Sequence, residues 1–194
     1  MAYEARLRTV GLGVLGVLVL GFGTAVAGDE PARHIEQKLG RYTVRYAEGP
    51  GENDSIGSYA IHVYGHGGEN WITGVVRPRN GGLGNLWLTR GQTQAELRIW
   101  VWLVSAGSGR YGKLDLLVFD GKAIQHRHLP MPSPKYIRGY MGHDDYSVTN
   151  GVVYRQFPLY RPGDCNARPS GGTRCLAMRV AGGSWVLSTH KVGF

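Results

Sequence analysis

The chain has 194 residues, of which 42% are hydrophobic and 19% are charged, so its composition excludes an intrinsically disordered protein and fits one folded domain with a sizeable core. Glycine occurs 31 times without a Gly-X-Y period, which excludes a collagen and favours short strands joined by tight turns. The formal charge is +8, but the basic residues are scattered rather than gathered in one run, so no nucleic-acid-binding arm is predicted.

The N-terminus has the parts of a secretory signal peptide that ends at Ala27. Arg6 and Arg8 supply positive charge, residues 10–23 are uncharged and largely apolar, and small residues follow at the spacing that signal peptidase requires. A membrane anchor is the alternative, but glycines dilute the apolar stretch and no basic residue follows it. We therefore predict an exported protein without a stable membrane anchor, whose single mature domain spans residues 28–194.

The mature chain is expected to form short β-strands. Apolar and polar side chains alternate along residues 41–46 and 58–64, which is the pattern of half-buried strands. Further β-rich runs are residues 71–77, 83–89, 97–104, 113–120 and 123–128. The run at 97–104 is apolar on both faces, as expected of a central strand. Only residues 31–39 have helical character.

Two hairpins are predicted in the C-terminal half. The first covers residues 146–157 and turns at an Asn-Gly pair, and the second joins residues 175–180 to residues 184–189. Residues 129–136 and 158–173 are rich in proline and glycine and are expected to form long loops. The whole pattern predicts an all-β protein, an antiparallel β-sandwich of roughly eight to ten short strands.

Cys165 and Cys175 are the two cysteines, too few for a tetrahedral cysteine metal site. In an oxidising compartment they are expected to pair as a disulfide. The bond would close a short loop and stabilise the fold by about 2.5–3 kcal/mol. This structural role is favoured over a catalytic one.

The strongest candidate site is the glycine-rich segment 105–112, between two predicted strands. Its glycines are Gly107, Gly109 and Gly112. They make such a loop thin and allow positive φ angles. The side chains expected to project from it are Ser108, Arg110 and Tyr111. Tyrosine and arginine are enriched at binding hot spots, which favours a binding loop over the alternative, an ordinary glycine-rich turn.

Residues in this segment resemble the Ser-Gly-x-Tyr signature of the periplasmic lysozyme inhibitors. They are Ser108, Gly109, Arg110 and Tyr111. The surrounding pattern resembles the branch of the family that acts on invertebrate-type (I-type) lysozymes. Residues 55–59, 142–145 and 160–174 are similar to the family in the same order. Together the resemblance extends from Tyr42 to Trp185.

The resemblance implies a periplasmic, non-enzymatic β-sandwich that protects peptidoglycan by inserting this loop into the cleft of a lysozyme, and it also implies a homodimer. A lysozyme cleft presents two carboxyl groups that face a sugar-sized gap. In that setting Ser108 is expected to donate its hydroxyl proton to a catalytic carboxylate, and Tyr111 to bury its ring. Gly107 and Gly112 shape the loop, and Arg110 occupies the variable position of the signature.

The charge of the mature chain leaves a second function open. With 20 basic and 13 acidic residues the charge is +7, which slows the encounter with a basic lysozyme. The conflict disappears if the lysozyme is acidic or if charge is unevenly distributed on the inhibitor. The alternative function is a non-enzymatic envelope module that binds glycan or an anionic surface through its aromatic and arginine side chains.

The histidines offer ligand types for a metal but no complete site. His126 and His128 share one face of a predicted strand, and His143 precedes two aspartates. No third ligand follows for the pair, so neither a metal nor another cofactor is predicted. Hydrolase chemistry is not favoured either, because Ser108 lies outside a Gly-x-Ser-x-Gly elbow and no carboxylate pair is singled out.

Overall fold

The computed structural model describes residues 33–50, 52, 55–91, 93–129, 132–181 and 184–192. The predicted signal peptide lies outside these residues. In the described part of the chain, helical structure consists of a 3-10 turn, η1 (His66–Gly68), and one short helix, α1 (Pro134–Ile137). No helix there is long and apolar enough to cross a membrane.

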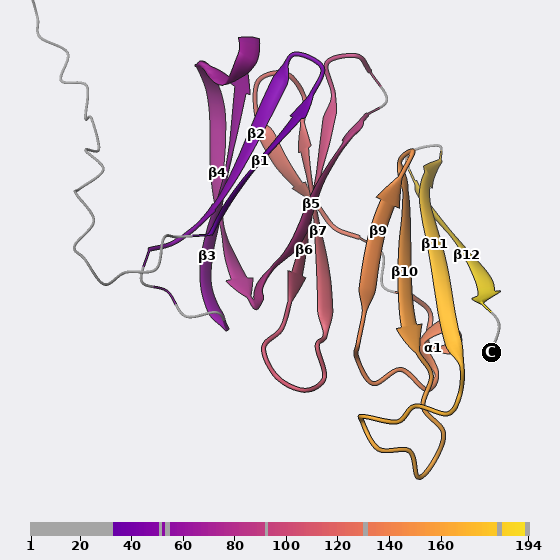
Figure 1. The fold of residues 1–194 in the computed structure, drawn as a ribbon. Coiled ribbons are helices and arrows are strands. Elements are labelled where there is room, and N and C mark those ends of the chain that lie inside the picture. The colour runs from indigo at the N-terminus through magenta and orange to yellow at the C-terminus, as the bar shows by residue number, and fades with distance from the viewer. Residues whose placement is uncertain are drawn as a thin grey trace, which may run out of the picture.

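The described residues form twelve strands in three antiparallel sheets (Figure 1). The N-terminal sheet contains, in spatial order, β1 (His34–Leu39), β2 (Tyr42–Glu48), β3 (Ile56–Gly65) and β4 (Asn70–Asn80). The central sheet contains β5 (Gly82–Arg90), β6 (Leu97–Val104), β7 (Gly112–Phe119) and β8 (Ile124–Arg127). The C-terminal sheet has the order β12 (Ser184–Val192), β11 (Thr173–Ala181), β10 (Val152–Pro158) and β9 (Asp145–Thr149).

The central sheet is covered on both faces by apolar side chains. Against the N-terminal sheet it forms the larger core, to which β6 contributes Ile99 and Val101. Against the C-terminal sheet it forms a second core, in which Trp100 of β6 packs with Val153 and Met178. This two-sided burial explains why β6 is apolar on both faces and confirms the prediction of a central strand at residues 97–104.

The sandwich prediction is confirmed, with two differences in detail. The described residues form twelve strands where eight to ten were expected. The helical character expected at residues 31–39 was wrong for the described part, because β1 pairs with β2 from His34 to Leu39. Ile35 and Leu39 both pack against the larger core, and a spacing of four residues fits one face of a strand as well as one face of a helix.

The expected disulfide is absent, because Cys165 and Cys175 are both free. Cys175 lies on β11 opposite Gln156, with its side chain buried, and burial raises the pKa of its thiol. Cys165 lies exposed in a turn that is closed by the hydrogen bond from the Arg168 N–H to the Cys165 carbonyl, at 3.0 Å. The strand therefore holds one sulfur inside while the turn holds the other in solvent.

We expect reductant to leave the Tm of the protein unchanged, and thiol titration of the unfolded, unreduced protein to find two thiols per chain. A disulfide worth about 2.5–3 kcal/mol would instead lower the Tm by several degrees on reduction. Differential scanning calorimetry with and without reductant measures this directly. A Tm that reductant lowers, together with no free thiol in the unreduced protein, would show that the disulfide forms.

Candidate functional site

The segment singled out in the sequence forms the loop between β6 and β7, residues 105–111, called here the β6–β7 loop. Two hydrogen bonds of 2.9 Å close its base, from the Ser105 N–H to the Tyr111 carbonyl and from the Tyr111 N–H to the Ser105 hydroxyl. Gly107 has a φ of 107°, which favours glycine. The loop is thus a closed turn with a defined backbone.

The three projecting side chains of the loop are all exposed. Tyr111 is 50% exposed, and its ring meets the edge of Tyr140 at a centroid distance of 5.8 Å. Arg110 instead lines a pocket with Arg33 and Trp102. Ser108 lies in the turn of the loop, two residues before Arg110. The structure therefore presents Ser108, Arg110 and Tyr111 to solvent, which their predicted binding role requires.

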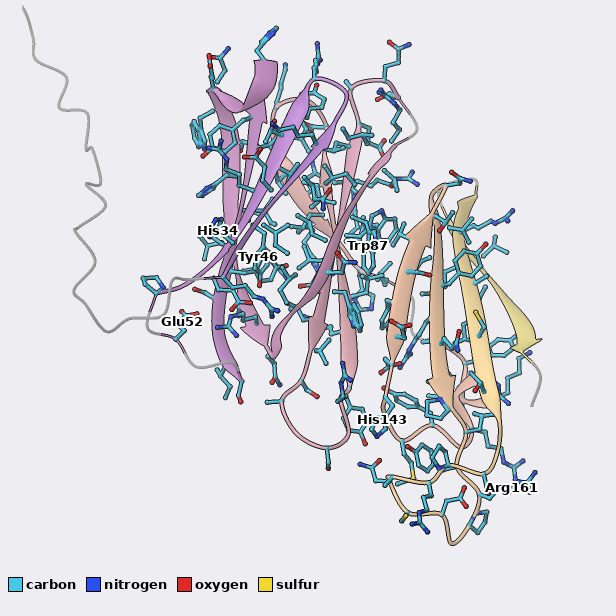
Figure 2. All side chains as sticks on the ribbon, viewed as in Figure 1. His34, Tyr46, Glu52, Trp87, His143 and Arg161 are labelled. Carbon is cyan, nitrogen blue, oxygen red and sulfur yellow. The ribbon has the colours of Figure 1, made fainter. Side chains whose placement is uncertain are left out.

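A segment before β9 holds the loop from the side of the C-terminal sheet. The His143 N–H donates to the Gly109 carbonyl at 2.6 Å, and the Gly112 N–H donates to the Asp144 carboxylate at 2.9 Å. A Cβ on Gly142 would lie 2.0 Å from the Gly109 carbonyl oxygen, so only glycine permits this approach. His143 lies beside the β6–β7 loop at the same end of the molecule in Figure 2.

Asp144 is the buried centre of this attachment. Its carboxylate accepts hydrogen bonds from Arg155, at 2.6 Å, and from the Tyr140 hydroxyl. Burial, followed by the bond to Asp144, raises the pKa of the Tyr140 hydroxyl above its ordinary value. Burial would lower the pKa of Arg155, but Tyr146 and Asp144 outweigh it and the pKa is raised. Arg155 therefore keeps its charge, and Asp144 connects it, on β10, to the Gly112 N–H at the start of β7.

Asn166, in the long loop between β10 and β11, makes a further contact with the β6–β7 loop. Its side-chain N–H donates to the Ser108 carbonyl at 3.0 Å. The Tyr160 hydroxyl donates to the Asn166 carbonyl at 2.9 Å and fixes its backbone. The sequence alone predicts no role for Asn166 or Asp144, although both lie in stretches that resemble the family.

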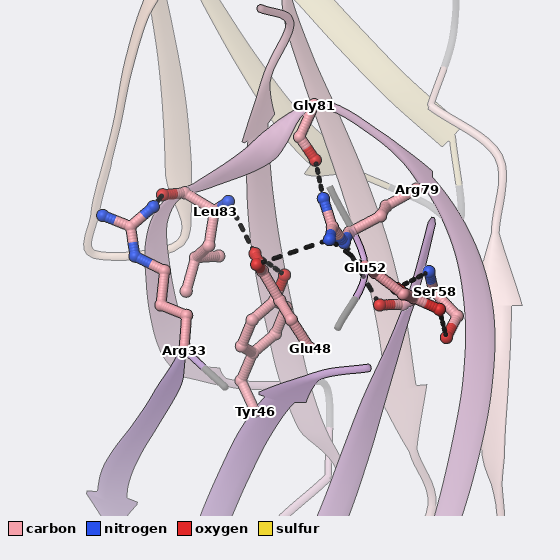
Figure 3. Close-up of polar contacts among 8 residues, drawn as sticks. All are labelled: Arg33, Tyr46, Glu48, Glu52, Ser58, Arg79, Gly81 and Leu83. Atoms are coloured by element: carbon pink, nitrogen blue, oxygen red, sulfur yellow. Dashed lines mark hydrogen bonds and ion pairs between the residues drawn. The ribbon is translucent and has the colours of Figure 1, made fainter. Parts of the chain in front are cut away.

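A buried polar network supports the loop from the N-terminal sheet (Figure 3). Glu48 accepts hydrogen bonds from the Tyr46 hydroxyl at 2.8 Å and the Leu83 N–H at 3.0 Å, and pairs with Arg79 at 3.6 Å. Arg79 also donates to the Gly81 carbonyl at 3.0 Å. A Cβ on Gly81 would lie 2.1 Å from the Val104 carbonyl oxygen. The network therefore fixes the β4–β5 corner against the end of β6, where the loop begins.

The histidines considered as metal ligands lie in two places. His126 and His128 line a pocket of about 480 Å³ beside Tyr111, whereas His143 lies within 3.2 Å of the Asn166 side-chain oxygen. His126 faces Asp115 at 3.6 Å. Asp115 is buried and accepts a hydrogen bond from the Tyr59 hydroxyl at 2.8 Å. In the described part of the chain no three His, Cys, Asp or Glu side chains group as metal ligands.

We expect Asn166→Ala to weaken the lysozyme inhibition that the resemblance implies by about 1 kcal/mol, roughly fivefold, because the Ser108 carbonyl loses its donor and the loop becomes less ordered. The Tm should change little, since the side chain is only partly buried and lies outside both cores. Inhibition titrations of the parent and the variant measure the effect. Equal inhibition by the two proteins would show that this bond does not order the loop.

A family model described as periplasmic lysozyme inhibitor of I-type lysozyme matches residues 33–142, more than half of the chain. The match includes the N-terminal sheet, the central sheet and the β6–β7 loop, and it ends before β9. Residues 143–145 and 160–174, which the resemblance in the sequence included, lie outside the match, so their similarity to the family stays a prediction.

Two solved structures are similar to the chain. Aeromonas hydrophila PliI in complex with Meretrix lusoria lysozyme is 27% identical, covers 49% of this chain and 81% of its own, and has a TM-score of 0.45. A structure of PliI-Ah, from the same species, is 27% identical, covers 48% of this chain and 84% of its own, and has a TM-score of 0.43. Among curated proteins none matches. On the strength of the family match, the chain belongs to the family of periplasmic inhibitors of I-type lysozyme, and its function is to inhibit lysozyme in the periplasm.

Proposed function

We propose that the chain inhibits an I-type lysozyme by filling its active-site cleft with the β6–β7 loop, and that it performs no catalysis itself. The supporting observation is that Ser108 and Tyr111 are exposed on a loop whose backbone is held by neighbouring segments, through His143 and Asn166. A loop that is ordered before binding loses less conformational entropy when the complex forms.

The chemistry of the two side chains suits a lysozyme cleft. Such a cleft contains a pair of carboxyl groups on either side of the scissile bond. The Ser108 hydroxyl donates to one of them, and this charge-assisted hydrogen bond is strong where water is excluded. The Tyr111 ring fills part of the sugar site, with its hydroxyl on a polar wall group. The loop then occupies the space that the polysaccharide needs.

A peptidoglycan-lysis assay tests the proposal, with the mature protein added to an I-type, a chicken-type and a goose-type lysozyme in parallel. We expect the I-type enzyme to be inhibited most strongly, at near-stoichiometric concentrations of the chain. The chain alone should release no soluble peptidoglycan fragments. Undiminished lysis by the I-type enzyme, or lysis by the chain alone, would reject the proposal.

A further inference from the structure

We propose that the end of the molecule carrying the β6–β7 loop is a basic docking surface for a lysozyme with an acidic cleft rim. The surface, called here the basic end, is defined by Arg110, Arg138, Arg161 and Arg168. All four are exposed. This inference rests on the proposed function and adds the charge of the partner to it.

The arginines of the basic end are available to a partner. Within the described residues none of the four forms an ion pair. Arg45 on the N-terminal sheet, by contrast, pairs with Glu36 at 2.8 Å. The positive charge of the basic end is therefore not neutralised by a salt bridge within the fold.

The carboxylates near the basic end only partly offset this charge. Asp144 is buried against Arg155. Asp164 accepts hydrogen bonds from the backbone N–H groups of Arg161 and Ser170, at 2.7 and 2.8 Å, so it serves to shape its own loop. Asp145 is exposed at the start of β9. Four arginines thus stand against two unburied aspartates on these segments.

The basic end adjoins the inhibitory loop. Asn166, which donates to the Ser108 carbonyl, lies in the same long loop as Arg161 and Arg168. Arg138 and Arg161 line one pocket of about 500 Å³, whose apolar wall includes Met141. Figure 2 shows Arg161 at the end of the molecule to which the β6–β7 loop points. A carboxylate on the rim of a cleft that receives the loop would therefore meet guanidinium groups.

Charge at this position acts first on the rate of encounter. A basic surface next to the docking loop attracts an acidic partner in the productive orientation and repels a basic one, and salt screens both effects. The mature chain carries a charge of +7 overall, which opposes binding to a basic lysozyme, so the partner that fits both the overall charge and its local distribution is acidic.

Stopped-flow association with two I-type lysozymes, one of negative and one of positive net charge at pH 7, tests the inference. With the acidic lysozyme we expect the association rate of the parent to fall as salt rises. A triple variant, Arg138→Gln, Arg161→Gln and Arg168→Gln, should associate about tenfold more slowly at low salt, with a dissociation rate within about twofold of the parent.

A matched control removes three positive charges at the opposite end of the sheets, with Arg41→Gln, Arg90→Gln and Lys122→Gln, all at exposed positions. It should keep most of the association rate and salt dependence of the parent. If the two triple variants have equal association rates and equal salt dependence, the basic end does not attract the acidic lysozyme. That result would leave the loop mechanism intact. A parent that binds and inhibits neither lysozyme would instead overturn the proposed function.

Discussion

Replacing Ser108 or Tyr111 by alanine is expected to weaken lysozyme inhibition by about 2 kcal/mol each, or roughly thirtyfold in Kd. Ser108→Ala removes the donor offered to a catalytic carboxylate, and Tyr111→Ala removes a ring that is half exposed in the free protein. Both side chains lie outside the two cores, so the Tm should stay close to that of the parent. Inhibition titrations and calorimetry on the same samples separate binding from folding.

Two further variants sharpen this test. Ser147→Ala changes an exposed serine on β9 and should inhibit as the parent does. Tyr111→Phe keeps the ring and removes only the hydroxyl, so its loss should be smaller than that of Tyr111→Ala. A Ser108→Ala/Tyr111→Ala double variant with undiminished inhibition would reject the loop as the inhibitory element.

Asp144→Ala is expected to cost about 3–5 kcal/mol in the free energy of unfolding, the largest stability effect that we predict. Arg155, whose side chain is 11% exposed, would keep its charge without the carboxylate that pairs with it. The Tyr140 hydroxyl and the Gly112 N–H would lose their acceptor as well. Urea unfolding measures the stability, and inhibition should weaken with it because Gly112 ends the β6–β7 loop.

The neighbouring Asp145→Ala provides the control, because Asp145 is exposed on β9 and should change stability by no more than about 0.5 kcal/mol. A double variant, Asp144→Leu with Arg155→Met, removes both charges and should be more stable than Asp144→Ala. Similar unfolding free energies for Asp144→Ala and Asp145→Ala would contradict the role assigned to the buried pair.

Local patterns predicted much of the fold. Strand β6 has the bounds expected from its apolar run at residues 97–104, and the Asn150-Gly151 turn joins β9 to β10 as expected. The strand conformation of β1 depends on its pairing with β2, because the sequence of β1 alone fits either a helix or a strand. The stacking of a third sheet on the central one likewise depends on contacts between distant residues.

At the site, the sequence identified the exposed residues of the β6–β7 loop but not the residues that hold the loop in place. The β6–β7 loop was found because its glycines and its Ser-Gly-x-Tyr pattern are contiguous. The contacts from Asp144 to Gly112 and from Asn166 to Ser108 join residues 32 and 58 positions apart, and only the packing of the sheets brings them together. The prediction of a disulfide was wrong for a similar reason. The spacing of the two cysteines gives the length of the loop between them but not the direction of their side chains.

Competition with a cleft ligand is the most direct test of the loop mechanism. The measurement is the Kd of the chain for an I-type lysozyme at increasing concentrations of a chito-oligosaccharide that occupies the active-site cleft. If the β6–β7 loop fills that cleft, the apparent Kd rises in proportion to the oligosaccharide concentration once the cleft is saturated. A Kd that stays constant while the cleft is filled would mean that the chain binds lysozyme elsewhere.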